Sequence, residues 1–336
     1  MSIVMTGGGT GGHLTIIKAV KEELLDQELI YIGSTKGQDQ AWFAEDKQFK
    51  ATHFLDTQGV VNQGLLGKFK SAFMLIKATF QAKKILKESN AKVVFCVGGF
   101  SAAPTSFAAK LLNIPLVIHE QNAAIGSLNK LLRPKAKAFI SSYEKQSPIK
   151  AYPIKKEYFE KSRIRENIQT IMFLGGSQGA RAINNLALEL APILKEKNIK
   201  IIHQAGENNI EVVQKAYEKL GIEAEVFGFT KELSNYMKQA DFVIARSGAS
   251  TLWELSAMAC PALYIPYPYA AGDHQFYNAK FLVDQDVAWI MRENELDVEK
   301  VIALLDENMR EKSEKLQELI EKDGALQIAE LLKKFA

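Results

Sequence analysis

The stretch TGGGTGGH, residues 6–13, directly follows the apolar run at residues 3–5 and leads into an amphipathic segment at residues 14–25. This order predicts a strand, a glycine loop and a helix. Glycines permit positive φ angles and close approach of a ligand, and the N-terminus of a helix adds positive potential. The loop is therefore expected to hold an anion or a sugar.

Two common nucleotide-binding loops fit this stretch poorly. Gly7, Gly9 and Gly12 have the dinucleotide-binding spacing, but that match alone is weak evidence for NAD, and the Lys-Ser or Lys-Thr pair of a Walker A loop is missing. His13 falls in the first turn of the predicted helix, where the helix dipole favours neutral imidazole. From this stretch alone, His13 fits a general base and a capping or packing residue equally well.

Length and composition restrict the class of protein. The chain has 336 residues, of which 47% are hydrophobic and 24% charged, as in a soluble globular protein of two domains. No segment offers the roughly 20 apolar residues that span a bilayer, and no export signal is seen, so a cytoplasmic location is expected. A net charge of +3 is too small to indicate nucleic-acid binding. Cys96 and Cys260 have no partner spacing, so neither a disulfide nor a metal site is expected.

Apolar runs typical of strands alternate with helical patterns in the first part of the chain. This alternation predicts a doubly wound α/β fold, in which helices cover both faces of a parallel sheet. The predicted strands lie at residues 3–5, 29–32, 93–97, 116–119 and 139–141, and the helices between them include residues 65–86 and 101–112.

A stretch rich in lysine and proline, residues 143–165, breaks this pattern and is interpreted as an interdomain linker. The opening order then returns, with a strand at 170–174, the glycine loop GGSQGAR at 175–181 and a helix at 183–194. A second doubly wound domain is expected to begin here. Its further strands are predicted at 199–203, 225–227, 242–245, 262–265 and 287–290, and its last helices at 298–305 and 309–335.

The densest polar cluster is RSGASTLWE, residues 246–254, between a predicted buried strand and a helix. Arg246 could pair with a phosphate, and the N–H groups that follow it open a helix toward the same anion. Glu254 lies one turn into that helix and is positioned to accept hydrogen bonds from ribose hydroxyls. A capping box between Ser250 and Glu254 is the alternative, with a spacing slightly off the ideal.

Polar and glycine residues gather at other predicted strand ends as well. HEQN, residues 119–122, follows an apolar run, and the residues GGFS at 98–101 end the preceding strand in the same way. A buried hydrogen-bond network is the alternative explanation for HEQN. Gln275 and Asn278 share one helix face, which could bind sugar hydroxyls.

Residues 64–87 combine apolar side chains with lysines and contain no acidic residue. Packing of an ordinary amphipathic helix explains most of the apolar positions, whereas the lysines beside them suggest contact with anionic lipids at a membrane surface. The membrane candidates are Leu65, Leu66, Lys68, Phe69, Lys70 and Phe73.

Five motifs, GGGTGGH, HEQN, GGSQGAR, RSGAST-x-x-E and DHQ-x-x-NA, occur in this order over essentially the whole chain. They resemble the MurG family of bacterial peptidoglycan glycosyltransferases, in glycosyltransferase family 28. The resemblance implies a GT-B fold with two Rossmann-like domains facing across a cleft. Residues 1–154 and 322–336 would form the acceptor and membrane-side domain, with the C-terminal helix crossing back onto it, and residues 155–321 the donor domain.

The resemblance also implies an activity. Family members transfer N-acetylglucosamine from UDP-N-acetylglucosamine (UDP-GlcNAc) to the 4-hydroxyl of the N-acetylmuramic acid sugar of lipid I, which gives lipid II. The anomeric configuration inverts, and no metal or cofactor is expected. The expected location is peripheral, on the cytoplasmic face of the bacterial inner membrane, where anionic lipids and other cell-wall assembly proteins are the expected partners.

Carried onto this sequence, the resemblance assigns candidate site residues. The catalytic candidates are His13, as base or orienting group, Asn122 and Glu120, and the acceptor-side candidates are Gly98, Gly99 and Phe100. The donor-binding candidates are Thr10, Gly11, Gly12, Asn122, Lys155, Ser177, Gln178, Thr230, Arg246, Gly248, Ala249, Ser250, Thr251, Leu252, Trp253, Glu254 and Gln275.

Three positions depart from the family pattern. Lys155 stands where the family has a phosphate-directed arginine, so bidentate pairing is lost. Phe100 replaces a tyrosine and has no hydroxyl to offer. The proline usual at the start of the first helix is absent from residues 14–17.

Two other functions are compatible with these motifs. A different GT-B enzyme, such as a UDP-GlcNAc 2-epimerase or a glycolipid synthase, would share the donor half, but HEQN argues against it. A nonenzymatic UDP-sugar-binding module that docks on membrane-bound assembly proteins would not need His13.

Overall fold

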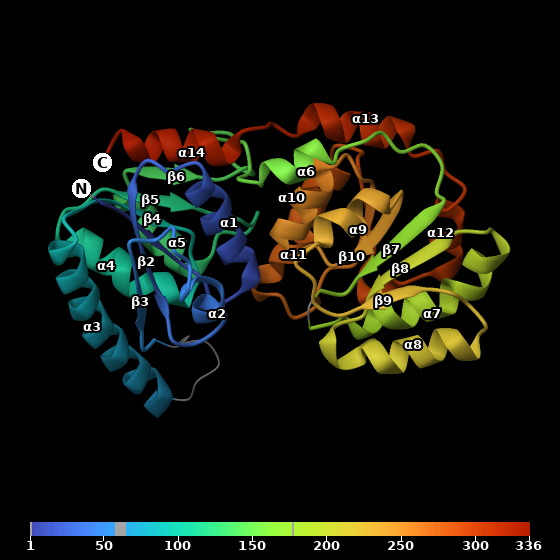
Figure 1. Ribbon diagram of the computed structural model, residues 1–336, viewed down its shortest axis with the longest axis horizontal. Helices are drawn as coiled ribbons and strands as arrows, with labels where there is room; N and C mark the ends of the chain where they lie inside the picture. The colour runs from blue at the N-terminus through green and yellow to red at the C-terminus, as the bar shows by residue number, and fades with distance from the viewer. Residues whose placement is uncertain (1, 58–64, 177) are drawn as a thin grey trace. The chain divides into compact units, whose positions relative to one another are not determined.

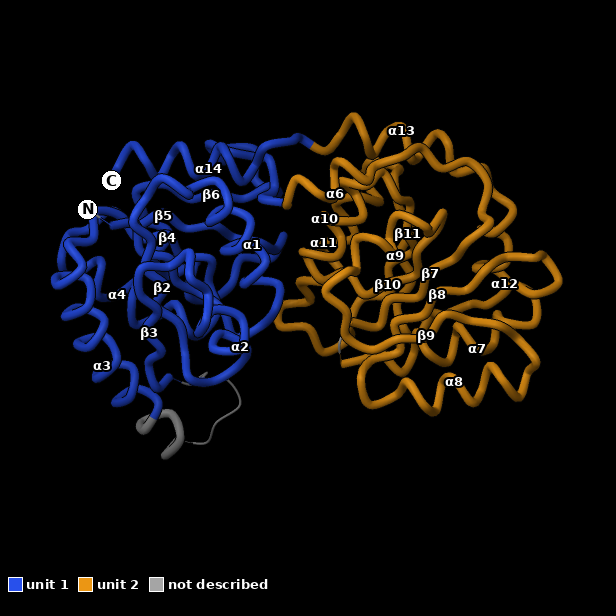
Figure 2. The backbone as a smooth tube through the Cα atoms, in the orientation of Figure 1, with its two compact units in different colours: residues 1–154, 321–336 blue, residues 155–320 orange. Residues whose placement is uncertain are grey.

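A computed structural model of the chain describes residues 2–57, 65–176 and 178–336. The chain divides into two compact units, Met1–Ile154 with Glu321–Ala336, and Lys155–Ile320 (Figure 2). Each unit contains a six-stranded sheet whose paired strands all run parallel, flanked by helices. The prediction of an α/β protein with two doubly wound parallel sheets is confirmed.

The first unit has the strand order β3-β2-β1-β4-β5-β6 (Figure 1). Its strands are β1 (Ser2–Thr6), β2 (Glu28–Ser34), β3 (Ala51–Leu55), β4 (Ala91–Cys96), β5 (Leu116–His119) and β6 (Ala138–Ile140). Its α-helices are α1 (Gly11–Glu22), α2 (Asp39–Phe43), α3 (Leu65–Glu88), α4 (Ala103–Leu111), α5 (Ser127–Leu132) and α14 (Gly324–Lys333).

Both faces of this sheet are buried. Val4 of β1 packs in one core with Ala82 of α3 and Ala109 of α4. Ile3 and Met5 point to the opposite face, because side chains alternate along a strand, and both are fully buried there. Strands covered on both sides are apolar throughout, which explains the continuous apolar runs in the sequence.

The second unit has the strand order β12-β11-β10-β7-β8-β9. Its strands are β7 (Thr170–Leu174), β8 (Lys200–Gln204), β9 (Glu225–Phe227), β10 (Phe242–Ala245), β11 (Ala262–Tyr264) and β12 (Trp289–Ile290). Its α-helices are α6 (Lys156–Glu160), α7 (Arg181–Glu196), α8 (Ile210–Lys219), α9 (Leu233–Gln239), α10 (Ala249–Ala257), α11 (His274–Val283), α12 (Val298–Leu304) and α13 (Arg310–Leu319). Side chains of α7, α8 and α12 share one core with the sheet.

Two features of the secondary structure differ from what the sequence led us to expect. The edge strand β3 was not predicted, because four of its five residues are only partly buried and lack a long apolar run. The predicted helix at residues 309–335 is two helices, α13 and α14, separated where Asp323 takes a positive φ of 63°. Gly324 then packs so tightly on the carbonyls of Ala151 and Tyr152 that a side chain would clash.

The stretch interpreted as a linker is folded rather than extended. Arg165 is fully buried, and its guanidinium donates hydrogen bonds to the carbonyl oxygens of Ala240 (3.1 Å) and Met258. Because these carbonyls belong to the loops after α9 and α10, Arg165 fixes the start of the second unit onto its own core. The boundary between the two units falls inside this stretch, between Ile154 and Lys155, and its last residues belong to the fold of the second unit.

Candidate active site

In the first unit, the loop after β1 interlocks with the loop after β4. Gly99 has a φ of +80°, and a Cβ there would lie 2.4 Å from the carbonyl oxygen of Gly8. The ring of Phe100 leaves equally little room beside Gly9, where a Cβ would lie 2.5 Å from the nearest ring carbon. The predicted acceptor-side residues Gly98, Gly99 and Phe100 therefore also shape the glycine loop.

A buried carboxylate, Asp39, holds the same glycine loop from the other side. The N–H of Gly9 donates to Asp39 Oδ1 at 3.0 Å, and the hydroxyl of Tyr31 donates to the carbonyl oxygen of Gly7 at 2.9 Å. Burial raises the pKa of Asp39, and the hydrogen bond from the N–H of Gly9 offsets part of this rise. The N–H of Gly9 is thus engaged by the protein itself. Sequence reasoning missed Asp39 and Tyr31, because neither stands in a recognisable motif.

His13 lies partly exposed in the first turn of α1, and each ring nitrogen has a side-chain neighbour. Nδ1 lies 3.0 Å from Oγ1 of Thr10, and Nε2 lies 3.1 Å from the amide nitrogen of Gln121. Gln121 was not among the predicted site residues, although it stands inside the HEQN motif. Its neighbour His119 is fully buried, and this burial, aided by the charge of His13, lowers the pKa of His119 to about 3.

Glu120 is only 3% exposed, and its carboxylate is occupied within its own loop. It accepts hydrogen bonds from the N–H of Asn122 (3.0 Å), the N–H of Gly126 (2.9 Å) and the side-chain amide of Asn129 (2.9 Å). These contacts fix the backbone of residues 120–126, the loop that also carries Gln121 and Asn122. The geometry favours a positioning role for Glu120 over that of a base.

In the second unit, the glycine loop after β7 packs on the loop after β8. A Cβ at Gly206 would lie 2.3 Å from the backbone nitrogen of Gly179, so the two backbones touch. Gln178 is exposed at this strand end, whereas Ser177, the other predicted phosphate contact, lies outside the described residues. Gly206 was not predicted, because its partner Gly179 is distant in sequence.

Arg246, expected to pair with a phosphate, already has protein partners. Its guanidinium donates to the carbonyl oxygens of Ile265 (3.0 Å) and Pro266 (3.1 Å), forms an ion pair with Glu293, and lies over the ring of Tyr267. These contacts fix the loop after β11. The structure therefore gives Arg246 the surroundings of a loop-stabilising residue rather than those of an open phosphate ligand.

The helix α10 begins at the carboxyl end of β10, with Gly248 as its N-cap residue. Among the described residues, no atom beyond the chain neighbours of Gly248 lies within 4 Å of a Cβ built there, so the backbone here borders open space. Ser250 and Thr251 are partly exposed at this helix start, while Ala249, Leu252 and Trp253 are buried. The side chains of Leu252 and Trp253 belong to the core, and a donor would meet only the backbone at these two positions.

Glu254 points toward α6, where its carboxylate accepts a hydrogen bond from the hydroxyl of Tyr158. Burial raises the pKa of Glu254 from 4.5 to about 8; the Tyr158 hydroxyl and the charge of Lys155 oppose this rise. The structure thus brings Lys155 and Glu254, two predicted donor residues distant in sequence, into one cluster. Lys155 also pairs with Glu157 at 3.5 Å.

The raised pKa of Glu254 predicts how stability changes with pH. Between pH 4.5 and about 8 the folded chain keeps a proton that the unfolded chain has lost, so this group makes the folded state less stable as pH rises. We expect Glu254→Gln, which cannot titrate, to gain stability relative to the parent as pH rises through this window. Urea unfolding at both ends of the window measures the difference, and a constant difference between the two proteins would contradict it.

Two further donor candidates lie on neighbouring loops. Gln275, near the start of α11, accepts a hydrogen bond from the N–H of Tyr267 at 2.9 Å. Thr230 follows β9, and its hydroxyl accepts from the N–H of Glu232 at 3.1 Å, which ties the side chain into its own turn.

Apart from Lys155, which precedes α6, the predicted donor residues of the second unit follow the carboxyl ends of β7, β9, β10 and β11, which lie on one edge because the strands are parallel. The first unit places Thr10, Gly11, Gly12 and His13 after β1, and Glu120 and Asn122 after β5, on the corresponding edge of its own sheet. In the described residues, no group of three or more histidine, cysteine or acidic side chains is placed to hold a metal ion.

Two doubly wound units, each with a glycine loop and polar side chains at the carboxyl edge of its sheet, are the architecture expected of a GT-B enzyme. Residues 3–141 match the glycosyltransferase family 28 N-terminal domain, and residues 170–334 match the glycosyltransferase family 28 C-terminal domain. The chain belongs to glycosyltransferase family 28 and is a glycosyltransferase.

Relatives match over essentially their whole length. A protein of Sulfurovum sp. is 66% identical over 336 residues, which cover 100% of this chain and 99% of that protein. A protein of Wolinella succinogenes is 49% identical over 99% of both chains. Both are named UDP-N-acetylglucosamine--N-acetylmuramyl-(pentapeptide) pyrophosphoryl-undecaprenol N-acetylglucosamine transferase.

Solved structures support the same fold. The crystal structure of Acinetobacter baumannii MurG superimposes with a TM-score of 0.79 at 28% identity and covers 99% of each chain. A Staphylococcus aureus MnaA–UDP structure has a TM-score of 0.65 at 12% identity, covers 100% of this chain and 97% of that one, and shows likeness of fold alone. The resemblance stated from the motifs is confirmed.

Proposed function

We propose that this glycosyltransferase moves N-acetylglucosamine from UDP-GlcNAc to the 4-hydroxyl of the N-acetylmuramic acid sugar of lipid I, and so forms lipid II for peptidoglycan. The observation that carries the proposal is the 66% identity, over the whole chain, to a protein named for this transfer. HEQN and its supporting contacts in the first unit add to it, because this unit would select the acceptor.

In the proposed reaction, the acceptor oxygen attacks the anomeric carbon as the bond from that carbon to the UDP oxygen breaks. His13 takes the proton of the acceptor hydroxyl, and the configuration at the anomeric carbon inverts. The departing diphosphate gains negative charge, which N–H groups at helix starts such as that of α10 stabilise. Lys155 and Glu254 would contact the nucleotide from their shared cluster.

The test separates this reaction from the alternatives by the fate of labelled UDP-GlcNAc. We expect the label to enter the lipid fraction with a lipid I analogue and not with water or a simple glycolipid acceptor. Formation of N-acetylmannosamine would support an epimerase instead. Binding of UDP-GlcNAc without any turnover would support a nonenzymatic module.

The proposed transfer needs no metal ion or cofactor, since protein dipoles and lysine side chains would stabilise the leaving diphosphate. We expect turnover to be unchanged after exhaustive chelation of divalent ions. The measurement is the initial rate with UDP-GlcNAc and a lipid I analogue before and after chelator treatment. A loss of activity that added magnesium or manganese restores would contradict this prediction.

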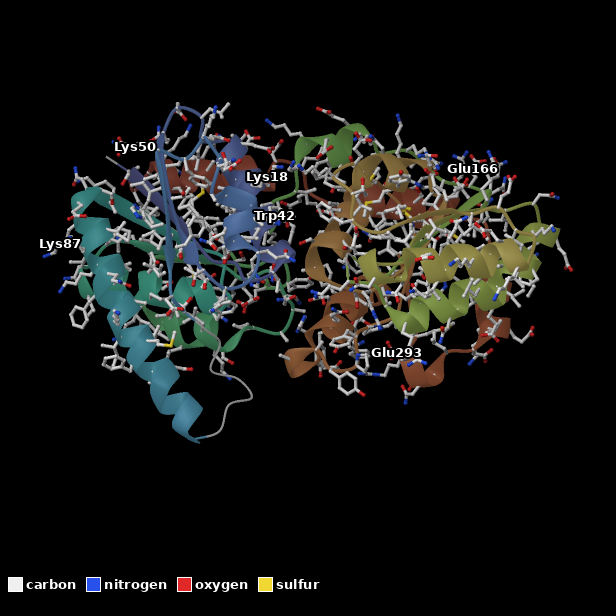
Figure 3. All side chains as sticks on the ribbon, turned by 60° about the horizontal axis from the view of Figure 1, so that its bottom comes forward. Lys18, Trp42, Lys50, Lys87, Glu166 and Glu293 are labelled. Carbon is white, nitrogen blue, oxygen red and sulfur yellow. The ribbon has the colours of Figure 1, made fainter. Side chains whose placement is uncertain are left out.

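We further propose that α3 rests on the cytoplasmic leaflet of the inner membrane. Phe73, Ile76 and Phe80 are exposed by 69%, 57% and 62% on one face of this helix, and the exposed lysines Lys77 and Lys87 recur at the same helical spacing. Lys87 projects outward from α3 in Figure 3. An exposed apolar stripe edged by lysines is the pattern of an interfacial helix.

The remaining residues of α3 add little to this proposal. The side chains of Leu65, Leu66, Lys68, Phe69 and Lys70 lie outside the described residues. Lys84 on the exposed stripe pairs with Glu88 at 3.7 Å, just beyond the acid-free stretch, and so carries less unbalanced charge. No helix in the described part of the chain is long and apolar enough to cross a membrane.

Charge reversal on α3 tests the membrane proposal. We expect Lys77→Glu, Lys84→Glu and Lys87→Glu together to weaken binding to anionic vesicles about a hundredfold at low salt, because each lysine near the surface contributes about 1 kcal/mol. Vesicle sedimentation measures the loss, and UDP affinity should stay at the parental value.

The matched control places equal charge changes on the second unit. Exposed lysines there are available at Lys200, Lys215 and Lys219. If the control triple variant loses vesicle binding as strongly as the α3 variant, net charge rather than α3 governs binding, and the α3 proposal is wrong.

A further inference from the structure

We infer that Gln121 is a positioning residue for His13: it binds the inward ring nitrogen Nε2 and leaves Nδ1 to take the proton of the acceptor. This inference rests on the proposed function, because it specifies how the proposed base is prepared. It concerns a side chain that touches His13 rather than the substrate.

The two ring nitrogens of His13 lie in different surroundings. Nε2 lies 3.1 Å from the side-chain amide of Gln121, which is only 7% exposed. Nδ1 lies 3.0 Å from the hydroxyl of Thr10, which is exposed at the start of α1. A sugar hydroxyl therefore reaches the side of Nδ1, while the protein interior covers the side of Nε2.

A neutral imidazole carries one proton, so Nδ1 can accept a proton only if Nε2 carries the N–H. Nε2–H then needs an acceptor, and the side-chain amide of Gln121 lies within hydrogen-bond distance of this position. In the structure the amide nitrogen of Gln121 faces His13, and Oε1 is buried without a hydrogen-bond partner among the described residues. The two amide atoms are distinguished by their hydrogen bonds, so a half-turn that gives Oε1 the N–H of His13, and places the amide N–H groups where Oε1 now lies, is an equivalent assignment of the same side chain.

The titratable neighbours of Gln121 do not take over this role. The carboxylate of Glu120 is engaged by Asn122, Gly126 and Asn129. His119 is fully buried and stays neutral, so it adds no positive charge beneath His13 at neutral pH. Glu120 instead shapes the loop from which Gln121 reaches Nε2.

The test uses the full chain with Gln121→Glu and Gln121→Met. Nitrogen-15 NMR of the His13 ring, followed as pH is raised until the signal stops changing, reports which nitrogen carries the proton in the neutral ring, and loss of the signal in His13→Gln assigns it. We expect Nε2–H in the parent and in Gln121→Glu, whose side chain offers an acceptor. In Gln121→Met the two tautomers should mix.

Kinetics give a second readout. With Gln121→Met, we expect kcat to fall roughly ten- to a hundredfold, less than after loss of His13 itself, with an unchanged KM for UDP-GlcNAc. Gln121→Glu should keep more activity than Gln121→Met. The matched control is Gln48→Met, which removes a glutamine hydrogen bond to the carbonyl of Lys21 in the same unit and should change neither readout.

Two results would overturn the inference: Nδ1–H as the dominant tautomer of the parent, or an unchanged tautomer and kcat in Gln121→Met. If the parent transfers no sugar although its His13 ring shows Nε2–H that depends on Gln121, the proposed function fails and the positioning of His13 by Gln121 stands.

Discussion

Replacing His13 with alanine is expected to lower kcat about a hundred- to ten-thousandfold, the usual cost of losing a general base. The acceptor hydroxyl is a weak nucleophile until its proton is removed, and His13 offers an imidazole nitrogen on the exposed side of α1. Because the nucleotide would be held by the second unit, the KM for UDP-GlcNAc and the affinity for UDP should stay near the parental values.

The measurement is the initial rate with saturating lipid I analogue, together with UDP affinity by calorimetry. His13 is partly exposed in a first helical turn, so the variant should unfold at nearly the parental temperature. A fall of less than tenfold in kcat would make His13 a structural loop residue, and the base would have to be sought elsewhere.

Gly206→Ala is expected to have the largest effect on the second unit. Gly206 has a φ of +90°, and a Cβ there would lie 2.3 Å from the nitrogen and 2.4 Å from the Cα of Gly179. The positive φ and the overpacking together should lower the free energy of unfolding by about 2–5 kcal/mol. Since backbone atoms must move, the loop that presents Gln178 should shift, and UDP affinity should fall at least about tenfold.

Gly176→Ala is the matched control in the neighbouring loop. Gly176 has a similar φ of +77°, but apart from its chain neighbours no atom of the described residues lies within 4 Å of a Cβ built there. Only the conformational cost of about 1–2 kcal/mol remains. Denaturant unfolding of both variants tests the comparison, and equal losses of stability would show that contact between the two loops is unimportant.

The sequence predicted the fold through features that act locally. Runs such as residues 170–174 and 242–245 are apolar because their strands are buried on both faces, and this pattern is readable without the structure. The glycine loops at residues 6–13 and 175–181 were also found, since strand, glycines and helix follow one another directly. The polar edge strand β3 gave no such signal.

The site was harder to predict because its support comes from residues distant in sequence. Asp39 holds Gly9, and Tyr158 of α6 binds Glu254, yet neither supporting residue stands in a motif. For Arg246 the type of residue suggested a phosphate, but the partner that the fold brings to it is Glu293. Gln121 stands inside the motif HEQN, but the sequence does not distinguish it from the other residues of that motif. Its 3.1 Å distance to the His13 ring, which only the structure shows, does.

The most direct test of the account is the chemical structure of the lipid product. Purified chain, UDP-GlcNAc and a lipid I analogue should give a lipid that is heavier by one N-acetylhexosamine, by mass spectrometry. Its proton NMR spectrum should show the new sugar attached through the 4-hydroxyl with a β linkage, because inversion converts the α configuration of the donor. A product with an α linkage, attachment at another hydroxyl, or an unmodified lipid beside released sugar would contradict the account.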